Sequence, residues 1–187
     1  MDELRKDCWN NAFHAFGTAY IFRIKAEKFK KYTSKLKFFG IAVPLTIGTT
    51  ASGYGFDSKF LKLAIIISAP LTIIQLIVSV LATVNKWDEE LSYSFESAAE
   101  NSEIALRYEN LAKYPPNNNK VLLEGEMAIL KTKQESRDKQ DDKHSITEKD
   151  ERKGMRYSLK YYQRTCTGCG QIITSMKPSS CNICGNF

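Results

Sequence analysis

Two long apolar segments separated by a short polar turn constrain the fold of this chain more than any other feature. The first covers residues 38–56, and the second covers residues 63–84 and contains no charged residue. Each is close to the ~20 residues that a helix needs to cross a ~30 Å hydrocarbon core. The intervening residues 57–62 are too few to form a folded domain. The sequence therefore predicts a transmembrane helical hairpin.

The alternative is that the two segments are buried helices of a soluble core. A helix that is apolar on nearly every side requires a large protein around it. The remainder of this 187-residue chain is strongly charged, and the mean hydropathy of the whole chain is −0.34. It offers no second apolar mass to surround the segments, so the membrane interpretation is favoured.

The distribution of basic residues predicts the orientation of the hairpin. The basic residues of the turn are Lys59 and Lys62, whereas residues 23–37, just before the first span, contain seven: Arg23, Lys25, Lys28, Lys30, Lys31, Lys35 and Lys37. Basic flanks remain on the cytoplasmic side, so both termini are expected in the cytoplasm. The net charge of +6 suits either an anionic lipid surface or a nucleic acid, and it does not distinguish between these two partners.

Long helices are predicted on both sides of the hairpin. Residues 3–35 carry an apolar stripe at spacings of three and four, formed by Trp9, Phe13, Phe16, Tyr20 and Ile24. This stripe is expected to pack against the helix that leaves the membrane, or to meet a neighbouring subunit. Residues 85–113 are predicted to continue the second span as an acidic helix, which would pair with the basic first helix.

A connecting region is expected over residues 115–153. Pro115 and Pro116 end the preceding helix, because proline cannot donate the helical hydrogen bond. Residues 121–131 predict a short helix, and the mixed charges of residues 131–153 predict a solvated helix or a flexible linker. His14 is expected to be a packing or capping residue, and His144 to be solvated.

Small and hydroxylated side chains share one face of each predicted span. They are Ser68, Thr72, Gln75, Ser79 and Thr83 in the second span, with Thr46 and Thr49 in the first. Such faces serve close helix packing in lipid. The sharper interpretation is that they line a water-filled path in a homo-oligomer, because a mid-membrane amide must face water or a partner. Neither span contains an acidic or basic residue, which argues against a proton relay.

Four cysteines near the C-terminus form a CxxC-x11-CxxC pattern: Cys166, Cys169, Cys181 and Cys184. Two such hooks suit a tetrahedral Zn²⁺ ion, and four protein ligands leave no open position, so the zinc would be structural. An iron–sulfur cluster or disulfides are the alternatives. Strand-like pieces at 157–162 and 171–174 predict a zinc ribbon over residues 154–187. Cys8 stands outside the pattern.

A basic and aromatic run precedes the first cysteine hook. Its charged residues Arg156, Lys160 and Arg164 alternate with tyrosines, a combination that stacks on bases or pairs with phosphates. We therefore predict that these three residues contact a partner, either a protein or a nucleic acid.

The hairpin with its long flanking helices resembles the SLATT family of bacterial two-transmembrane effectors. The resemblance covers residues 9–111, through WNNAFHAFGTAYIFRIKAEKF, the two spans and the helix after Trp87. The tail is similar to the SLATT-bearing mobilome proteins that carry the CxxC-x11-CxxC pattern. The resemblance implies an anti-phage effector of the bacterial inner membrane, encoded beside a nucleotide-signal synthase or a reverse transcriptase. It implies no catalytic residues.

The fold expected from the sequence is thus an all-α membrane protein, with a SLATT-like domain over residues 1–114, a linker and a zinc ribbon. The first functional hypothesis is a non-enzymatic effector that oligomerises and permeabilises the membrane. The second is a membrane-anchored adaptor whose zinc ribbon binds a protein or nucleic acid. No Ser/His/Asp set, phosphate loop or open metal site suggests an enzyme.

Overall fold

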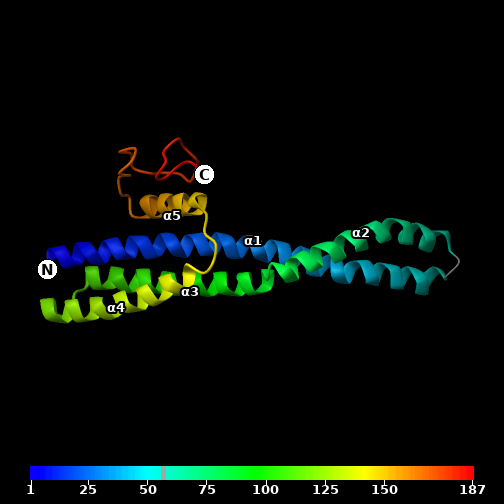
Figure 1. The fold of residues 1–187 in the computed structure, drawn as a ribbon, viewed down its shortest axis with the longest axis horizontal. Helices are drawn as coiled ribbons and strands as arrows, with labels where there is room; N and C mark the ends of the chain where they lie inside the picture. The colour runs from blue at the N-terminus through cyan, green and yellow to red at the C-terminus, as the bar shows by residue number, and fades with distance from the viewer. Residues whose placement is uncertain (56–57) are drawn as a thin grey trace. The chain divides into compact units, whose positions relative to one another are not determined.

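The computed structural model describes residues 1–55 and 58–187, and its ordered elements are helices (Figure 1). Phe56 and Asp57, the last residue of the expected first span and the first of the turn, lie outside the described residues. The elements are α1 (Asp2–Tyr54), α2 (Lys59–Val84), α3 (Trp87–Lys113), the 3-10 turn η1 (Pro116–Asn118), α4 (Lys120–Asp141) and α5 (Glu148–Tyr161). The predicted all-helical fold is confirmed for this part of the chain.

The chain divides into two compact units. The first, which we call the helical unit, combines Met1–Lys25 with Tyr93–Phe187. The second, the hairpin unit, is Ala26–Ser92. Helices α1 and α3 each contribute residues to both units.

Small residues on α1 form the centre of the helical unit. Cys8, Ala12 and Ala15 are buried, and they pack against a larger apolar set from α3 and α4: Ile104, Ala105, Tyr108, Ala112, Leu123 and Leu130. Small side chains let helix backbones approach closely, so bulky partners fill the space without voids. The cysteine outside the metal pattern, Cys8, is therefore a core residue.

The aromatic stripe of α1 has a second partner, α5, in addition to the one predicted. The Phe16 ring lies 5.2 Å from Tyr157 and 4.3 Å from Tyr161, both on α5. The Tyr20 ring is stacked on Tyr157 with 3.8 Å between centroids. The prediction that this stripe packs on the helix after the hairpin holds in part: Trp9 and Phe16 pack against the cluster formed by α3 and α4, and the contact with α5 was not predicted.

Helices α1 and α5 touch backbone to backbone (Figure 1). A Cβ atom on Gly154 would lie 2.8 Å from the carbonyl oxygen of Gly17, and one on Gly17 would lie 2.9 Å from Ser158 Oγ. Ser158 Oγ donates to the Phe13 carbonyl oxygen at 2.9 Å. This crossing holds the C-terminal part of the chain against α1.

The charged segment after residue 131 is ordered and not a free linker. It continues α4 to Asp141, where Arg137 and Asp141 are buried. His144 stacks on the Tyr93 ring with centroids 3.4 Å apart, so the prediction that it is solvated was wrong. Both charged residues are paired in the interior: Arg137 meets two carboxylates of α3, and Asp141 pairs with Arg137 and accepts hydrogen bonds from neutral groups of α3.

The hairpin unit leaves its apolar side chains on the outside. Ser58 caps α2 by accepting a hydrogen bond from the Leu61 amide, and α2 then continues through Pro70 to Val84. A turn at Asn85–Lys86, where Lys86 has a φ of 53°, separates α2 from α3. The predicted uninterrupted helix across residue 85 is therefore corrected.

Candidate metal centre

The four tail cysteines converge on one point. Their Sγ atoms all lie within 4.8 Å of one another, and the Cys166–Cys181 and Cys169–Cys184 pairs are both 3.9 Å apart. Four sulfurs at ~2.3 Å from a tetrahedral ion would be ~3.8 Å from each other. The geometry therefore fits a metal-binding site with four protein ligands, as the sequence pattern predicted.

Backbone hydrogen bonds shape each cysteine hook. The Gly170 amide donates to the Cys166 carbonyl oxygen at 2.8 Å, and the Gly185 amide donates to that of Cys181 at 2.9 Å. Gly170 has a φ of 68°, a conformation that favours glycine. The two hooks therefore have matching turns that direct both sulfurs of each hook inward.

The pKa values of two of the ligand thiols shift in opposite directions. Backbone hydrogen bonds from Cys184 and Ile183 lower the pKa of Cys181 to about 7, whereas burial raises the pKa of Cys184. Thiolates so close together repel one another. A positive ion at their centre offsets that repulsion, and thiolates are the form that binds metal.

The fold around the cysteines differs from the predicted ribbon. Within the described residues, 157–161 belong to α5, and the only strand-like pairing is a single antiparallel bridge between Thr165 and Ile172. The prediction of a strand at 157–162 was wrong. Thr147 and Asp150 form a capping box at the start of α5, and their T-x-x-D spacing was the sequence signal for that helix.

An apolar cluster joins the metal centre to α1 and α5. Cys166, Cys184 and Ile173 are buried together with Leu159 of α5 and Phe13 of α1. The centre is thus built into the helical unit, and its position depends on the packing of α5.

Arg156 lies under the second hook, inside the protein. Its Nε donates to the Ser175 carbonyl oxygen at 2.8 Å, and Nη1 donates to the Cys184 carbonyl oxygen at 3.0 Å. Nη1 also lies 3.7 Å from Cys184 Sγ. Arg156 was predicted to contact a partner, but its side chain is buried and orients the metal centre.

The other residues of the basic and aromatic run divide between the interior and the surface. Arg164 Nη1 donates to Asn10 Oδ1 at 2.8 Å, and its guanidinium covers the Phe13 ring. Tyr162 donates to Glu109 at 2.7 Å, and burial together with this bond raises the pKa of Tyr162. Lys160 is half-buried. Tyr157 and Tyr162 pack internally, whereas Tyr161 is 57% exposed.

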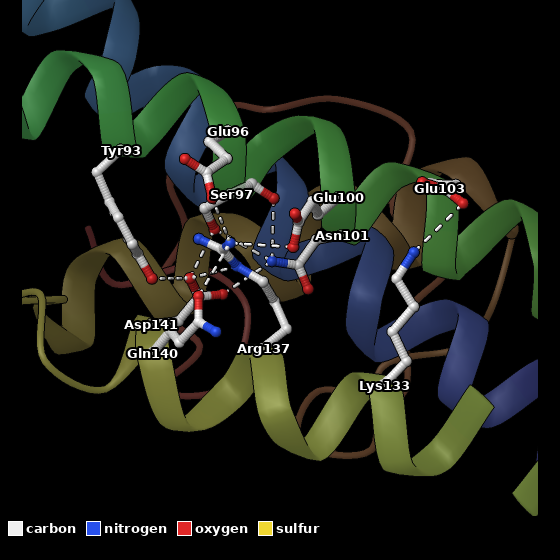
Figure 2. Close-up of polar contacts among 10 residues, drawn as sticks. All are labelled: Tyr93, Glu96, Ser97, Glu100, Asn101, Glu103, Lys133, Arg137, Gln140 and Asp141. Atoms are coloured by element: carbon white, nitrogen blue, oxygen red, sulfur yellow. Dashed lines mark hydrogen bonds and ion pairs between the residues drawn. The ribbon is translucent and has the colours of Figure 1, made fainter. Parts of the chain in front are cut away.

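A buried polar cluster, which the sequence did not reveal, links α3 to α4 (Figure 2). Asp141 accepts hydrogen bonds from Tyr93 at 2.6 Å, Ser97 at 2.8 Å and Asn101 at 2.8 Å. Arg137, only 2% exposed, donates to Asp141 at 3.2 Å. Its Nη1 also meets two carboxylates of α3, Glu96 at 3.3 Å and Glu100 at 3.0 Å.

The spacing of this cluster was a usable signal. Ser97 and Asn101 lie four residues apart on α3, as do Arg137 and Asp141 on α4. Residues four apart share one helix face, so two such polar pairs on neighbouring helices predict a buried cluster. We name these residues, with Tyr93, the α3–α4 polar cluster.

Hydroxyl groups of the polar face in the hairpin bond to their own helices. Thr46 donates to the Ala42 carbonyl oxygen at 2.7 Å, and Thr49 to that of Leu45 at 2.9 Å. Similar bonds in α2 join Thr72 to Ser68, Thr83 to Ser79 and Ser68 to Ile65. Gln75 lies against α1, because a Cβ atom on Gly40 would be 3.0 Å from its Nε2. Ser79 is half-buried.

The fold and the site define a class: an all-helical protein with one strongly apolar, exposed helix and a four-cysteine metal-type centre. The sequence profile of one family matches residues 5–187. The chain belongs to that family, described as Mobilome CxxCx(11)CxxC protein. No match was found among curated proteins, and none among solved structures. The SLATT resemblance stays a prediction.

Proposed function

We propose that this protein is a membrane effector of bacterial anti-phage defence. In this proposal the hairpin unit inserts into the inner membrane with both termini in the cytoplasm. Copies of the chain assemble and permeabilise the membrane when an operon-encoded sensor, a nucleotide-signal synthase or a reverse transcriptase, triggers them. Defence and triggering follow from the SLATT resemblance, whereas insertion has structural support.

The exposure of α2 carries the proposal. Among the helices of the described residues, α2 alone is long and apolar enough to cross a membrane, and none of its most apolar part is buried. Ile66 is 70% exposed and Ile73 is 60% exposed. A contiguous apolar surface of this kind marks a membrane or protein interaction site. Lipid would bury it without requiring a partner at every position.

The second arm of the hairpin is the part of α1 that pairs with α2. Its large side chains Phe38, Ile41 and Leu45 are all exposed. The hydroxyl groups of Thr46 and Thr49 in this arm donate hydrogen bonds within the helix. They therefore do not require water as a partner. These intrahelical bonds suit helix packing in lipid, and a pore would then require assembly of several hairpins.

We propose that the metal is Zn²⁺ and that its role is structural. Four thiolates in a tetrahedral arrangement are a common structural zinc site, and they leave no position for a substrate. The metal would hold the tail against Leu159 and Phe13.

Membrane potential tests the effector proposal. A voltage-sensitive dye would report depolarisation in cells that express the chain with its genomic neighbour and a trigger. Gln75→Leu removes the polar amide from the hairpin and should abolish depolarisation, whereas Ser102→Ala, outside the hairpin unit, serves as the control. An unchanged potential in triggered cells, with insertion confirmed by resistance to carbonate extraction, would contradict the effector proposal.

A membrane-anchored adaptor is the second candidate. It is favoured by two exposed isoleucines beside the cysteine hooks, Ile172 and Ile183. Such side chains offer an apolar contact for a protein partner, with Lys160 nearby in the sequence. Lys160→Glu or Ile183→Asp should then abolish co-purification of the genomic neighbour while depolarisation is retained.

A further inference from the structure

A groove between the two arms of the hairpin unit differs from the rest of its apolar surface. It has a volume of about 280 Å³, near the lower end of the ~300–1,000 Å³ of small-molecule sites. Apolar side chains of both arms form its walls, including Leu36, Leu71 and Ile74. Tyr32, Lys35 and Trp87 line it as well, so basic and aromatic groups share the groove with aliphatic ones.

We propose that this groove binds one anionic phospholipid, with an acyl chain against Leu71 and Ile74 and the phosphate near Lys35. The inference rests on the proposed insertion of the hairpin unit. It goes further, because it names a specific lipid class and a specific place for it.

Charge complementarity supports an anionic headgroup. Two carboxylates that directly follow Trp87 in the sequence are already paired: Asp88 with Lys37 at 2.9 Å and Glu89 with Lys86 at 3.0 Å. Lys35 is exposed, and no ion pair to it occurs among the described residues. A lysine beside a membrane surface attracts anionic lipid, and here it is not neutralised by a neighbouring carboxylate.

The two aromatic side chains of the groove suit the headgroup level of a bilayer. The rings of Tyr32 and Trp87 lie 5.5 Å apart. Tyrosine and tryptophan are enriched at this level, since one end of each side chain is apolar and the other is polar. Together with Lys35 they place amphipathic and basic side chains at one end of the groove, while Ile74 and Leu71 lie farther along the apolar helix.

Gln75 gives an independent indication of a polar guest. Gln75 is one of the residues that line the groove, and its amide lies against Gly40, where the missing Cβ makes room for it. No hydrogen bond to this amide is present among the described residues. An amide in lipid requires a partner, and the ester or glycerol oxygen of a phospholipid in the groove would supply one.

Tryptophan quenching tests the lipid site in the full chain. The protein has two tryptophans, so Trp9→Phe leaves Trp87 as the reporter. This variant would be placed in nanodiscs that contain brominated phosphatidylglycerol or, separately, brominated phosphatidylcholine. We expect half-maximal quenching at roughly fivefold lower mole fraction of phosphatidylglycerol, the preference that one unpaired lysine confers.

Matched variants assign the preference to the groove. Lys35→Gln should remove the difference between the two lipids, and Lys31→Gln, on the same helix and outside the groove, should retain it. Equal quenching by both lipids in an inserted protein would overturn the lipid site and leave the membrane proposal intact. Shielding of Trp87 from both lipids in a dimer would also overturn it, in favour of a second copy. Failure to insert would overturn both.

Discussion

Arg156 connects the packing of the tail to its metal centre. The guanidinium supplies hydrogen bonds to two backbone carbonyl oxygens and approaches one ligand sulfur. Partners of this kind orient metal ligands and stabilise their charged form. A residue that sequence analysis assigned to the surface therefore controls the interior of the site.

Replacing Arg156 should weaken metal binding. For Arg156→Met we expect metal affinity to fall by roughly 10- to 100-fold, the usual cost of losing such a partner. Competition with a chromophoric chelator measures this affinity. Arg152→Met is the control, because Arg152 bonds to the Asn186 carbonyl oxygen and touches no ligand cysteine. Equal affinities of the two variants would contradict the role of Arg156.

Tyr108 makes the stability of the helical unit sensitive to alkaline pH. Burial raises the pKa of Tyr108 from its ordinary value of 10.0 to about 12. The folded state thus favours the neutral phenol, so this contribution to stability is complete below pH 10 and is lost as the pH rises through about 12. Absorbance at 295 nm should show a late-titrating tyrosine that becomes ordinary in denaturant. Uniform titration of every tyrosine near its ordinary pKa would contradict this.

At the scale of elements, the crossing of α1 and α5 depends on two glycines. Gly154→Ala would place a methyl group against the Gly17 carbonyl oxygen and Ile21. Overpacking of this kind costs about 1–3 kcal/mol, which thermal or chemical unfolding would measure. Gly125→Ala, in open space on α4, should instead stabilise by up to ~1 kcal/mol. Similar effects of the two alanines would argue against close contact.

The α3–α4 polar cluster predicts a second contrast between neighbouring residues. Asp141→Ala removes the acceptor of Tyr93, Ser97 and Asn101, and it leaves buried donors unpaired. Breaking a buried ion pair costs about 3–5 kcal/mol. Asp142→Ala, one residue further and exposed, should change the free energy of unfolding by no more than ~0.5 kcal/mol. Urea unfolding of both variants makes the comparison.

The sequence was most informative where the physical rule is local. Helix periodicity predicted α1 to α3, and CxxC spacing predicted which four sulfurs converge, because both depend on residues near one another in the chain. It was least informative where partners are distant. Charge alone could not distinguish a solvated Arg137 from a buried one, since burial depends on Asp141 together with residues of α3.

The same limit explains α5 and the aromatic run. Basic and aromatic residues such as Arg156 and Tyr157 are interleaved in this run, which suits a strand. The same pattern also suits a helix that packs against other parts of the protein on two faces. Packing of Tyr157 on Tyr20, 137 residues earlier in the chain, favours the helix. The capping box formed by Thr147 and Asp150 was the local sequence signal that favoured the helix.

At the scale of the whole molecule, removal of the metal should separate the stability of the cysteine-containing tail from that of the helical core. Chelation should release the tail, because a segment of this size buries too little apolar surface to fold by itself. Helices α1, α3 and α4 share a core without cysteine ligands, so most helical circular dichroism should persist. Cysteine reactivity should be measured alongside. Before chelation only the buried Cys8 is expected to react, and slowly; after chelation the four ligand cysteines should react as well. Loss of all helical signal on chelation would contradict this separation.

The long separation in sequence between α1 and its partners also sets an order during synthesis. Phe13 and Ser158 are 145 residues apart, and Asn10 and Arg164 are 154 apart. A ribosome adds about 5–20 residues each second, so α5 is synthesised roughly 7–30 s after the part of α1 that it contacts. Residues 38–84 emerge during that interval. Under the proposed function, the hairpin would thus be able to insert before the C-terminal segments can cover the start of α1.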